Sequence, residues 1–218
     1  MMTLKTRWAD EAMCDMPLPE YPRPQMVREN WINLNGMFDF AITGDIDWCD
    51  EYKDEIRVPF AVESCLSGVC KRVSAKDRLW YRKKITLPEN FKGKRTLLHF
   101  GAVDWECKVY VNKKEVGSHI GGYCPFVIDI TDALTDGENE LVVRVYDPTD
   151  EGWQNRGKQA SESHGFWYTS TSGIWQTVWM EAVSENYIAS YKVTPDIDNA
   201  VVALKTDVIG TGALKVKI

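Results

Sequence analysis

Apolar and polar residues alternate with a period of two through the middle of the chain, at residues 97–131. In the run CKVYVN the apolar positions are Cys107, Val109 and Val111, and more polar residues stand between them. Successive side chains of a β-strand point to opposite faces, so this run predicts a strand with one buried and one solvated face. No part of the stretch has the period of an amphipathic helix. The pattern predicts antiparallel β-structure.

A turn is predicted at Asn112 and Lys113, where this strand gives way to a returning strand with Val116 on its inner face. Asn tolerates positive φ, which favours a tight hairpin. A lysine at positive φ is strained by roughly 1 kcal/mol. We therefore expect a turn type that keeps Lys113 out of that region. Gly121 and Gly122 then allow a further bend before the next strand.

The two-residue period recurs along the chain, and turn-forming residues separate the strands at intervals of about 8–12 residues. In the strand at 79–87, Tyr81 and Ile85 occupy the apolar face, whereas Trp80 and Arg82 occupy the face expected to be wet. Many short strands with regular turns are typical of a β-sandwich. The other predicted strands of this part lie at residues 37–42, 56–60, 124–130, 140–146 and 174–180.

The N-terminal residues depart from this pattern. Residues 1–30 contain Pro17, Pro19, Pro22 and Pro24. A proline removes a backbone donor and blocks the helix interior, so these residues exclude a regular helix. They predict an extended arm on the surface, dispensable for the core.

Near the C-terminus the alternation resumes at 187–194 and 201–208, and in a last apolar row formed by Leu214, Val216 and Ile218. Strands as few and short as these bury too little surface to be stable alone. We expect the sequence to break off inside a second β-domain. We also expect the uncovered row to pair between chains, giving a homo-oligomer.

Composition and charge restrict the function. The 218 residues are 44% hydrophobic and 27% charged, as in a globular chain with one large domain, or one domain and part of another. A net charge of -6 without a basic stripe excludes nucleic-acid binding. No apolar run approaches the ~20 residues of a membrane span, and the first residues lack the apolar segment of a secretory signal. We expect a cytoplasmic protein without a membrane partner.

The six cysteines show neither Cys-x-x-Cys spacing nor the density of a disulfide framework. Two of them, Cys107 and Cys124, alternate along their predicted strands as core residues do. We expect reduced, structural cysteines, in keeping with a cytoplasmic location. The full set is Cys14, Cys49, Cys65, Cys70, Cys107 and Cys124.

Several longer runs stand in a fixed order: EYPRPQ, WINLNG, VPFAVESCLSG, FGAVDWECKVYVN, VGSHIGGYCPFVIDIT and WYTSTSGIWQTVW. Together they cover residues 20–183 approximately, and they resemble the amino-terminal sugar-binding domain of glycoside hydrolase family 2, the β-galactosidase and β-glucuronidase family. Two departures from the family are single substitutions within or directly beside these runs. Lys113 replaces the usual Gly of the hairpin turn, and Gln176 stands where many members have Arg.

The resemblance implies an all-β fold: a jelly-roll β-sandwich of the galactose-binding-domain-like kind, with a truncated second β-sandwich at the C-terminus. It divides the chain into an extended arm at 1–30, a sugar-binding domain at 31–185 and the first strands of an immunoglobulin-like domain at 186–218. In the family a (β/α)₈ barrel follows. The parent enzyme is then expected to hydrolyse O-glycosyl bonds of β-glycosides, with carbohydrate and the missing domains as partners.

Catalytic chemistry is not expected in this chain. Hydrolysis with retention needs two carboxylic acids about 5–5.5 Å apart, and the family places both catalytic Glu residues in the barrel. The 32 Asp and Glu residues lie mostly in turns and on wet strand faces, where they serve solubility. His99, His119 and His164 are too dispersed for a metal site, and no serine has the Gly-x-Ser-x-Gly context of a hydrolase. No cofactor is expected.

Carbohydrate recognition needs exposed aromatic faces with polar groups beside them. The chain has nine tryptophans, and residues 147–165 form a long loop without periodicity, typical of a functional or mobile segment. Burial in the core is the commoner explanation for any single tryptophan, but these aromatic residues gather in two loops. The predicted sugar-binding residues are Asp104, Trp105, Trp153, His164, Trp167 and Tyr168.

Two functions stay open from the sequence. In β-galactosidases the position just before the Ser-Gly-Ile segment carries an acidic residue that belongs to the active-site rim. This chain has Trp167 and Tyr168 there, so that role is not transferred. The alternative to a glycosidase domain is a free-standing carbohydrate-binding or scaffold β-sandwich without hydrolase activity.

Overall fold

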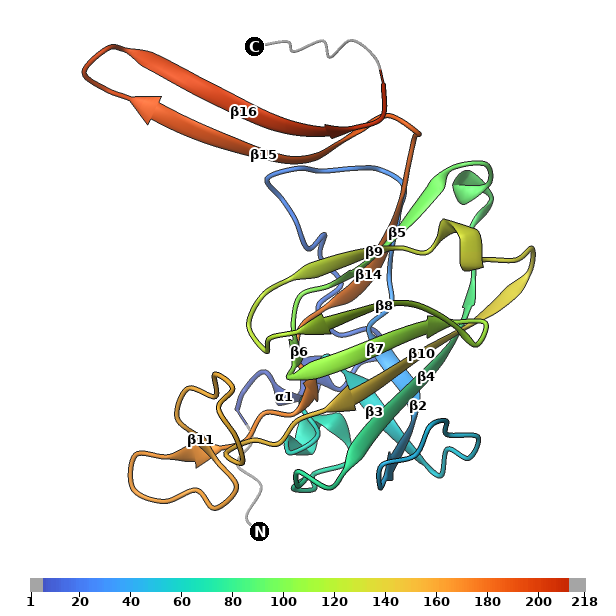
Figure 1. Cartoon of the computed structure of the whole chain (residues 1–218), viewed down its shortest axis with the longest axis vertical. Helices are drawn as coiled ribbons and strands as arrows, with labels where there is room; N and C mark the ends of the chain where they lie inside the picture. Colours follow the sequence, from blue (N-terminus) through green and yellow to red (C-terminus); the bar gives the residue numbers. More distant parts are fainter. Residues whose placement is uncertain (1–5, 212–218) are drawn as a thin grey trace.

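The computed structural model describes residues 6–211, and its regular structure is almost entirely β-strand. Two antiparallel sheets face each other around the main core (Figure 1), which confirms the predicted β-sandwich. The first sheet has, in spatial order, β1 (Trp31–Asn33), β14 (Val178–Val183), β5 (Arg95–Phe100) and β9 (Phe126–Asp129). The second has, in spatial order, β3 (Asp54–Val58), β2 (Gly36–Thr43), β4 (Arg78–Thr86), β10 (Glu138–Tyr146), β7 (Glu106–Val111) and β8 (Lys114–Ile120).

Alternating side chains from both sheets fill the core. In β7 the buried positions are Cys107, Val109 and Val111, as the alternation predicts. Tyr81 on β4 packs edge-on against Phe40 on β2, with the ring centroids 5.0 Å apart, and both side chains are fully buried. Burying a side chain of this size stabilises the fold by about 1.5–3 kcal/mol. Two short 3-10 helices add buried residues at its margin, η2 (Glu89–Phe91) and η3 (Thr131–Ala133).

Trp80 lies on the outer face of the six-stranded sheet and is nevertheless fully buried, so the prediction of a wet face is wrong at this position. The connection between β2 and β3 folds back over the sheet, and its Trp48 packs against both Trp80 and Tyr110. Arg82 lies 4.2 Å over the ring of Tyr52 from the same connection. The period of a strand identifies its two faces, but it does not show which distant segment covers them.

The turn between β7 and β8 places both Asn112 and Lys113 at positive φ, 51° and 65°, so the expectation that Lys113 avoids this region is wrong. The reason lies in the Asn112 side chain. Its amide nitrogen donates to the Ala133 carbonyl (2.9 Å) and to Asn139 Oδ1 (2.7 Å). Its Oδ1 accepts from the Glu140 N–H (3.0 Å). These contacts hold Asn112 in the left-handed region, and Lys113 follows it.

The N-terminal arm contains one short helix, α1 (Ala9–Ala12), so the exclusion of helix is wrong for the part before the prolines. Further along the arm, Arg23 and Arg28 reach the carboxylate of Glu181 on β14, at 2.7 and 2.5 Å. His99 on β5 lies 3.0 Å from the same carboxylate. Glu181 is 0% exposed, so the arm is joined to the outer face of the first sheet by a buried charged group.

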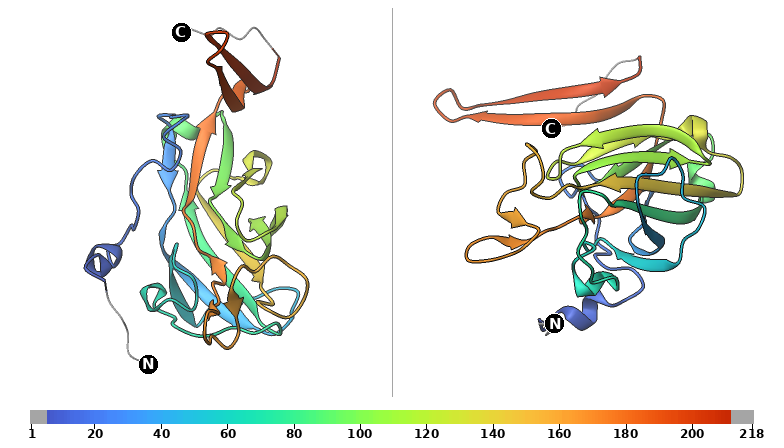
Figure 2. Two further views of the ribbon diagram at one scale, coloured as in Figure 1. Left: turned by 90° about the vertical axis from the view of Figure 1, so that its left-hand side faces the viewer. Right: turned by 60° about the horizontal axis from the view of Figure 1, so that its bottom comes forward.

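A separate two-stranded antiparallel sheet, the hairpin of β15 (Tyr187–Asp196) and β16 (Val201–Ile209), projects from one end of the sandwich (Figures 1 and 2). Both predicted strands of this region are confirmed. The expected last row lies outside the described residues: Leu214, Val216 and Ile218.

The arm also contacts this hairpin. The guanidinium of Arg28 donates to the Ile188 carbonyl and lies over the ring of Tyr187, 5.6 Å from its centroid. The hydroxyl of Tyr191 donates to the Gln25 carbonyl. Residues of the arm therefore stand between the first sheet and the base of the hairpin, and Arg28 is bonded to both.

Cys65 and Cys70 form a disulfide around the 3-10 helix η1 (Cys65–Ser67), so the expectation of reduced cysteines is wrong for this pair. The turn at Gly68, with φ 86°, brings their Cα atoms to 4.4 Å, within the range that a disulfide spans. Cys107 is a buried thiol, and burial raises its pKa to about 12. Its role is that of a small core residue.

Candidate functional site

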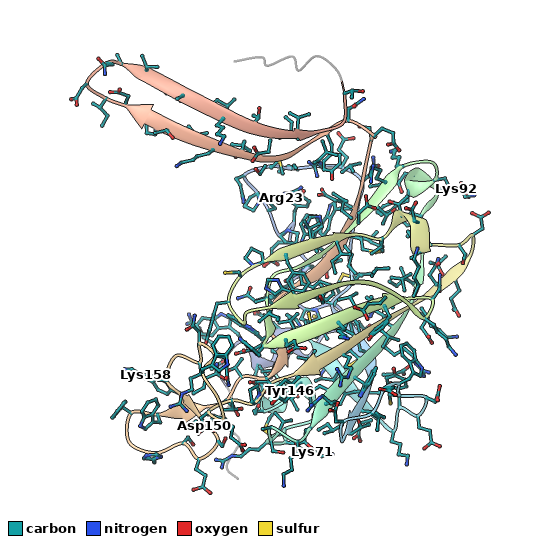
Figure 3. All side chains as sticks on the ribbon, in the orientation of Figure 1. Arg23, Lys71, Lys92, Tyr146, Asp150 and Lys158 are labelled. Carbon is teal, nitrogen blue, oxygen red and sulfur yellow. A yellow bond between two sulfur atoms is a disulfide. The ribbon has the colours of Figure 1, made fainter. Side chains whose placement is uncertain are left out.

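The end of the sandwich away from the hairpin carries a long loop, residues 147–172, which meets two bends at 101–105 and 121–123 (Figure 1). We call these three segments the loop end. Asp150 and Lys158 mark the long loop in Figure 3. Two short ladders give it backbone order: β6 (Val103–Asp104) pairs antiparallel with β13 (Gly173–Ile174), and β11 (Gln159–Ala160) pairs parallel with β12 (Tyr168–Thr169).

Trp153 is the most exposed aromatic residue of the loop end, with 90% of its surface open to solvent. Its ring stands edge-on to that of Trp105, with the centroids 6.2 Å apart and the planes at 84°. Next to this pair, Tyr123 stands edge-on to Trp175 at 6.4 Å, and Trp175 Nε1 donates to the Gly122 carbonyl (2.8 Å). Exposed indole and phenol faces of this kind suit the apolar face of a pyranose ring.

Asp104 precedes Trp105 in the chain and is only 3% exposed, and it therefore does not reach a ligand in solution. Its Oδ2 accepts a hydrogen bond from Gln159 Nε2 (2.9 Å). Its other oxygen packs against Gly122, where a Cβ atom would lie 2.3 Å from Oδ1. Burial, followed by the negative charge of Asp147, raises the pKa of Asp104 from 3.8 to about 7. Asp104 is a structural carboxyl group of the site.

Two other shielded carboxyl groups brace the end of the long loop. Asp147 accepts from the Ser172 hydroxyl (2.6 Å) and from the Thr149 N–H (2.7 Å). Glu63 accepts from the Ser170 hydroxyl (3.0 Å) and from the Ser172 N–H (2.9 Å). Burial raises the pKa of both carboxyl groups. They fix the direction in which the chain leaves the loop and enters β13.

The remaining predicted residues lie further out on the loop. Phe166 packs against Trp167 at a centroid distance of 4.9 Å, and the guanidinium of Arg156 lies 5.1 Å over the Trp167 ring. Tyr168 is exposed and belongs to β12, paired through the backbone with Gln159. The Nδ1 atom of His164 lies 2.8 Å from a carbonyl of its own loop, that of Glu162.

The structure thus brings Asp104, Trp105 and Trp153 together, joins Tyr168 to them through the short β11–β12 ladder, and gives His164 only a local contact. Sequence reasoning missed Tyr123, Trp175 and Gln159. Tyr123 and Trp175 stand in the runs GGYCPF and SGIWQ, where the aromatic residue type is the signal that points to a ligand contact. Gln159 gave no signal at all, because it stands in a loop without periodicity.

Within residues 6–211 no set of three or more His, Cys, Asp or Glu side chains is arranged to hold a metal ion. None of the helices in that part of the chain has the length and apolar character needed to cross a membrane.

The sequence profile described as "Glycosyl hydrolases family 2, sugar binding domain" matches residues 21–183, from the arm to the last strand of the sandwich. The chain belongs to glycosyl hydrolase family 2. A putative beta-glucuronidase of Formosa agariphila is 34% identical over 118 residues, which are 53% of this chain and 13% of that protein. A beta-galactosidase of Thermoanaerobacter pseudethanolicus is 33% identical over 134 residues, which are 60% of this chain and 18% of that protein.

Solved structures of family 2 share the fold. A beta-glucuronidase of an uncultured Clostridium sp. superposes with a TM-score of 0.65 at 23% identity, and a b-glucuronidase from Ruminococcus gnavus with 0.66 at 21%. The match covers 89% and 88% of this chain but only 36% of each of those chains. At these identities the likeness establishes the sandwich fold. The chain spans well under half the length of every relative named here.

Proposed function

We propose that this chain is the sugar-binding, active-site-shaping N-terminal domain of a family 2 glycoside hydrolase whose whole form hydrolyses O-glycosyl bonds of β-glycosides. The observation that carries the proposal is the pair Trp153 and Trp105 at the loop end, where one indole stands almost fully exposed against another. An exposed tryptophan costs solubility and contributes nothing to the core, so its position favours contact with a ligand or a neighbouring domain.

The proposal includes the domain plan expected from the sequence. It consists of an arm at 1–30, a jelly-roll domain of the galactose-binding kind at 31–185 and the start of an immunoglobulin-like domain at 186–218. The catalytic carboxyl groups would come from a barrel outside this chain, with the loop end at its rim. The cytoplasmic location stays a prediction, and the Cys65–Cys70 disulfide counts against it because reducing compartments disfavour such bonds.

The test replaces Trp153 by Ala in the longest gene product that contains this chain. Loss of one stacking face should lower kcat/KM on a nitrophenyl β-glycoside about tenfold, mainly through KM. Trp8→Ala is the matched control, because Trp8 is also exposed but lies on the arm. Equal kinetics for the two variants would remove the loop end from the proposed site.

The alternative is a free-standing carbohydrate-binding module, and the same exposed Trp153 would serve it. Calorimetry of the 218-residue chain with methyl β-galactoside and methyl β-glucuronide distinguishes the two. Millimolar or tighter affinity that is lost in Trp153→Ala favours the free-standing module. If the 218-residue chain gives no binding heat with either sugar, and Trp153→Ala lowers kcat/KM in the longer protein, the glycosidase domain is favoured.

A further inference from the structure

The side chain of Gln159 joins three separate segments of the loop end. Its Nε2 donates to Asp104 Oδ2 (2.9 Å) and to the Tyr123 hydroxyl (3.1 Å). Its Oε1 accepts from the Thr171 N–H (2.5 Å). Both donor hydrogens and one oxygen lone pair are therefore used inside the protein. Gln159 is equipped to hold the loop and has little capacity left for a ligand.

The backbone of Gln159 ties the loop together as well. In β11 it pairs with Tyr168 of β12, and its N–H donates to the Arg156 carbonyl (3.1 Å). One residue thus links the outgoing half of the loop, the returning half, the β6–β7 bend at Asp104 and the bend at Tyr123. No other side chain described at the loop end bonds to as many segments.

The loop has little hydrophobic burial to hold it in place. Between residues 149 and 170 the large apolar side chains of Trp153, Phe166 and Tyr168 are exposed and that of Trp167 is half-buried, and Ala160 is the one buried hydrophobic side chain there. A segment with few buried apolar contacts opens at low cost unless hydrogen bonds restrain it. The order of this loop therefore depends on polar contacts, and those of Gln159 stand at its centre.

We infer that Gln159 is the positioning residue of the loop end: it anchors the long loop to Asp104 and Tyr123 and so sets Trp153 against Trp105 for contact with a pyranoside. The ligand part of this inference rests on the proposed function. The anchoring part stands on the hydrogen bonds alone. Its consequence is that affinity for a β-linked pyranoside depends on a residue that does not touch the sugar, because a preorganised platform loses less entropy on binding.

The experiment compares Gln159→Leu with Gln154→Leu in the 218-residue chain. Gln154 is the matched control, since it lies in the same loop but its amide donates only to the Thr149 carbonyl of that loop (2.9 Å). Limited trypsin digestion followed by mass spectrometry reports cleavage after Arg156 and Lys158, and calorimetry reports the thermal midpoint. We expect cleavage about tenfold faster in Gln159→Leu than in the wild type. The Gln154→Leu rate should stay near the wild type.

A second pair of variants separates anchoring from general damage. At pH 8, Gln159→Glu should open the loop, because a carboxylate then faces Asp104. Adding Asp104→Asn should close it again, since the new amide, the Tyr123 hydroxyl and the Thr171 N–H can all donate to the carboxylate introduced at position 159. Gln159→Glu alone should also regain protection from trypsin below pH 6, because the introduced carboxyl group and that of Asp104 then share a proton. A residue that merely filled space would show neither the rescue nor the pH dependence.

These experiments test the anchoring role of Gln159 separately from the proposed sugar binding. Equal cleavage in Gln159→Leu and Gln154→Leu overturns the anchoring role, whatever the sugar data show. Faster cleavage together with no affinity of the wild type for methyl β-galactoside or methyl β-glucuronide supports the anchoring role and counts against sugar binding by the isolated chain. Faster cleavage with a weaker affinity than in Gln154→Leu supports both.

Discussion

Asp104 illustrates how a buried polar group can organise a site at a cost in stability. Its carboxyl group lies between Gln159 and Gly122, and its pKa is raised from 3.8 to about 7, by burial first and by Asp147 second. A raised pKa means that the folded chain binds the proton more tightly than the unfolded chain. Ionisation of Asp104 therefore weakens folding as pH rises from about 4 to about 7.

We predict that Asp104→Asn stabilises the chain above neutral pH. Asn keeps an oxygen for the Gln159 donor but carries no charge, so the gain should be near zero at pH 4, grow until about pH 7, and level off at up to about 4 kcal/mol. Thermal midpoints of both proteins between pH 4 and 8 measure it. A constant difference across this range would show that Asp104 does not titrate as inferred.

Glu181 is also a buried carboxyl group, but its pKa is lowered, whereas that of Asp104 is raised. Burial acts to raise its pKa, but the hydrogen bond from His99 and the charges of Arg23 and Arg28 act more strongly and lower it from 4.5 to about 2. Burial also lowers the pKa of His99, which leaves the ring neutral and donating to Glu181 at neutral pH. A depressed carboxyl pKa stabilises the fold above pH 4.5 and loses that effect as pH falls towards 2.

We predict that Glu181→Gln lowers the free energy of unfolding by about 3 kcal/mol at pH 7, because two guanidinium groups lose their buried partner. The matched control is Glu185→Gln. Glu185 is largely exposed and lies 3.6 Å from Arg95, so its loss should cost less than about 0.5 kcal/mol. Denaturant unfolding of both variants measures the difference. Similar small losses would mean that the arm is held instead by Tyr21, whose ring packs edge-on against Trp31 and Trp179.

The sequence indicated some residues of the site and not others, for a physical reason. Trp105 and Trp153 are predicted from residue type alone, which suggests stacking on sugar, and the structure sets their rings edge-on to each other. Gln159 is not predicted, because an amide gains its role only from the three segments that the fold brings around it. Asp104 was found as a ligand contact, but its burial gives it a supporting role.

At the scale of elements, contacts between segments override a backbone preference in the β7–β8 turn. Lysine favours negative φ, but the segments bonded to Asn112 hold the turn in the left-handed region. Lys113 takes φ 65° because the side chain of Asn112 is fixed by neighbouring segments. We predict that Lys113→Gly stabilises the chain by about 1 kcal/mol, since Gly occupies this region without the strain of a Cβ atom. Lys114→Gly, in the adjoining strand, is the control and should destabilise it. Thermal unfolding of the two variants gives opposite shifts if the turn is strained.

Strands were predicted more accurately than the segments that connect them. A two-residue period depends only on neighbouring positions, so the alternation in β7 and β10 was sufficient to identify them. The cover over Trp80, the helix α1 and the Cys65–Cys70 bond depend on contacts between segments or on short loop geometry. Periodicity carries no information about these features.

For the whole molecule, we predict that the 218-residue chain does not hydrolyse nitrophenyl β-glycosides. Asp104 and Asp147 are both shielded from substrate, and retention requires two accessible acids about 5–5.5 Å apart. Assays on repurified protein with galactoside and glucuronide substrates measure this. Turnover that copurifies with the chain and is lost in Asp104→Asn would show that a buried carboxyl group reaches substrate.

The β15–β16 hairpin bears several exposed apolar side chains, and an isolated two-stranded ribbon is marginally stable. They include Val193, Ile197, Val201, Val202, Leu204, Val208 and Ile209. The N-terminal arm contacts this hairpin at its base, where Arg28 bonds to the Ile188 carbonyl while keeping its link to Glu181. Burial of the apolar hairpin against a second copy would therefore associate chains without altering the sandwich core.

Deletion of residues 187–218 should accordingly leave a folded monomer, whereas the full chain should associate at the same concentration. Arg28 would lose one acceptor but keep its Glu181 partner, so the thermal midpoint of the sandwich should change little. Chromatography with light scattering gives the mass, and calorimetry gives the midpoint. A shortened chain that fails to fold would place the hairpin within the folding unit of the sandwich. A full chain that stays monomeric would mean that the apolar face needs a different partner.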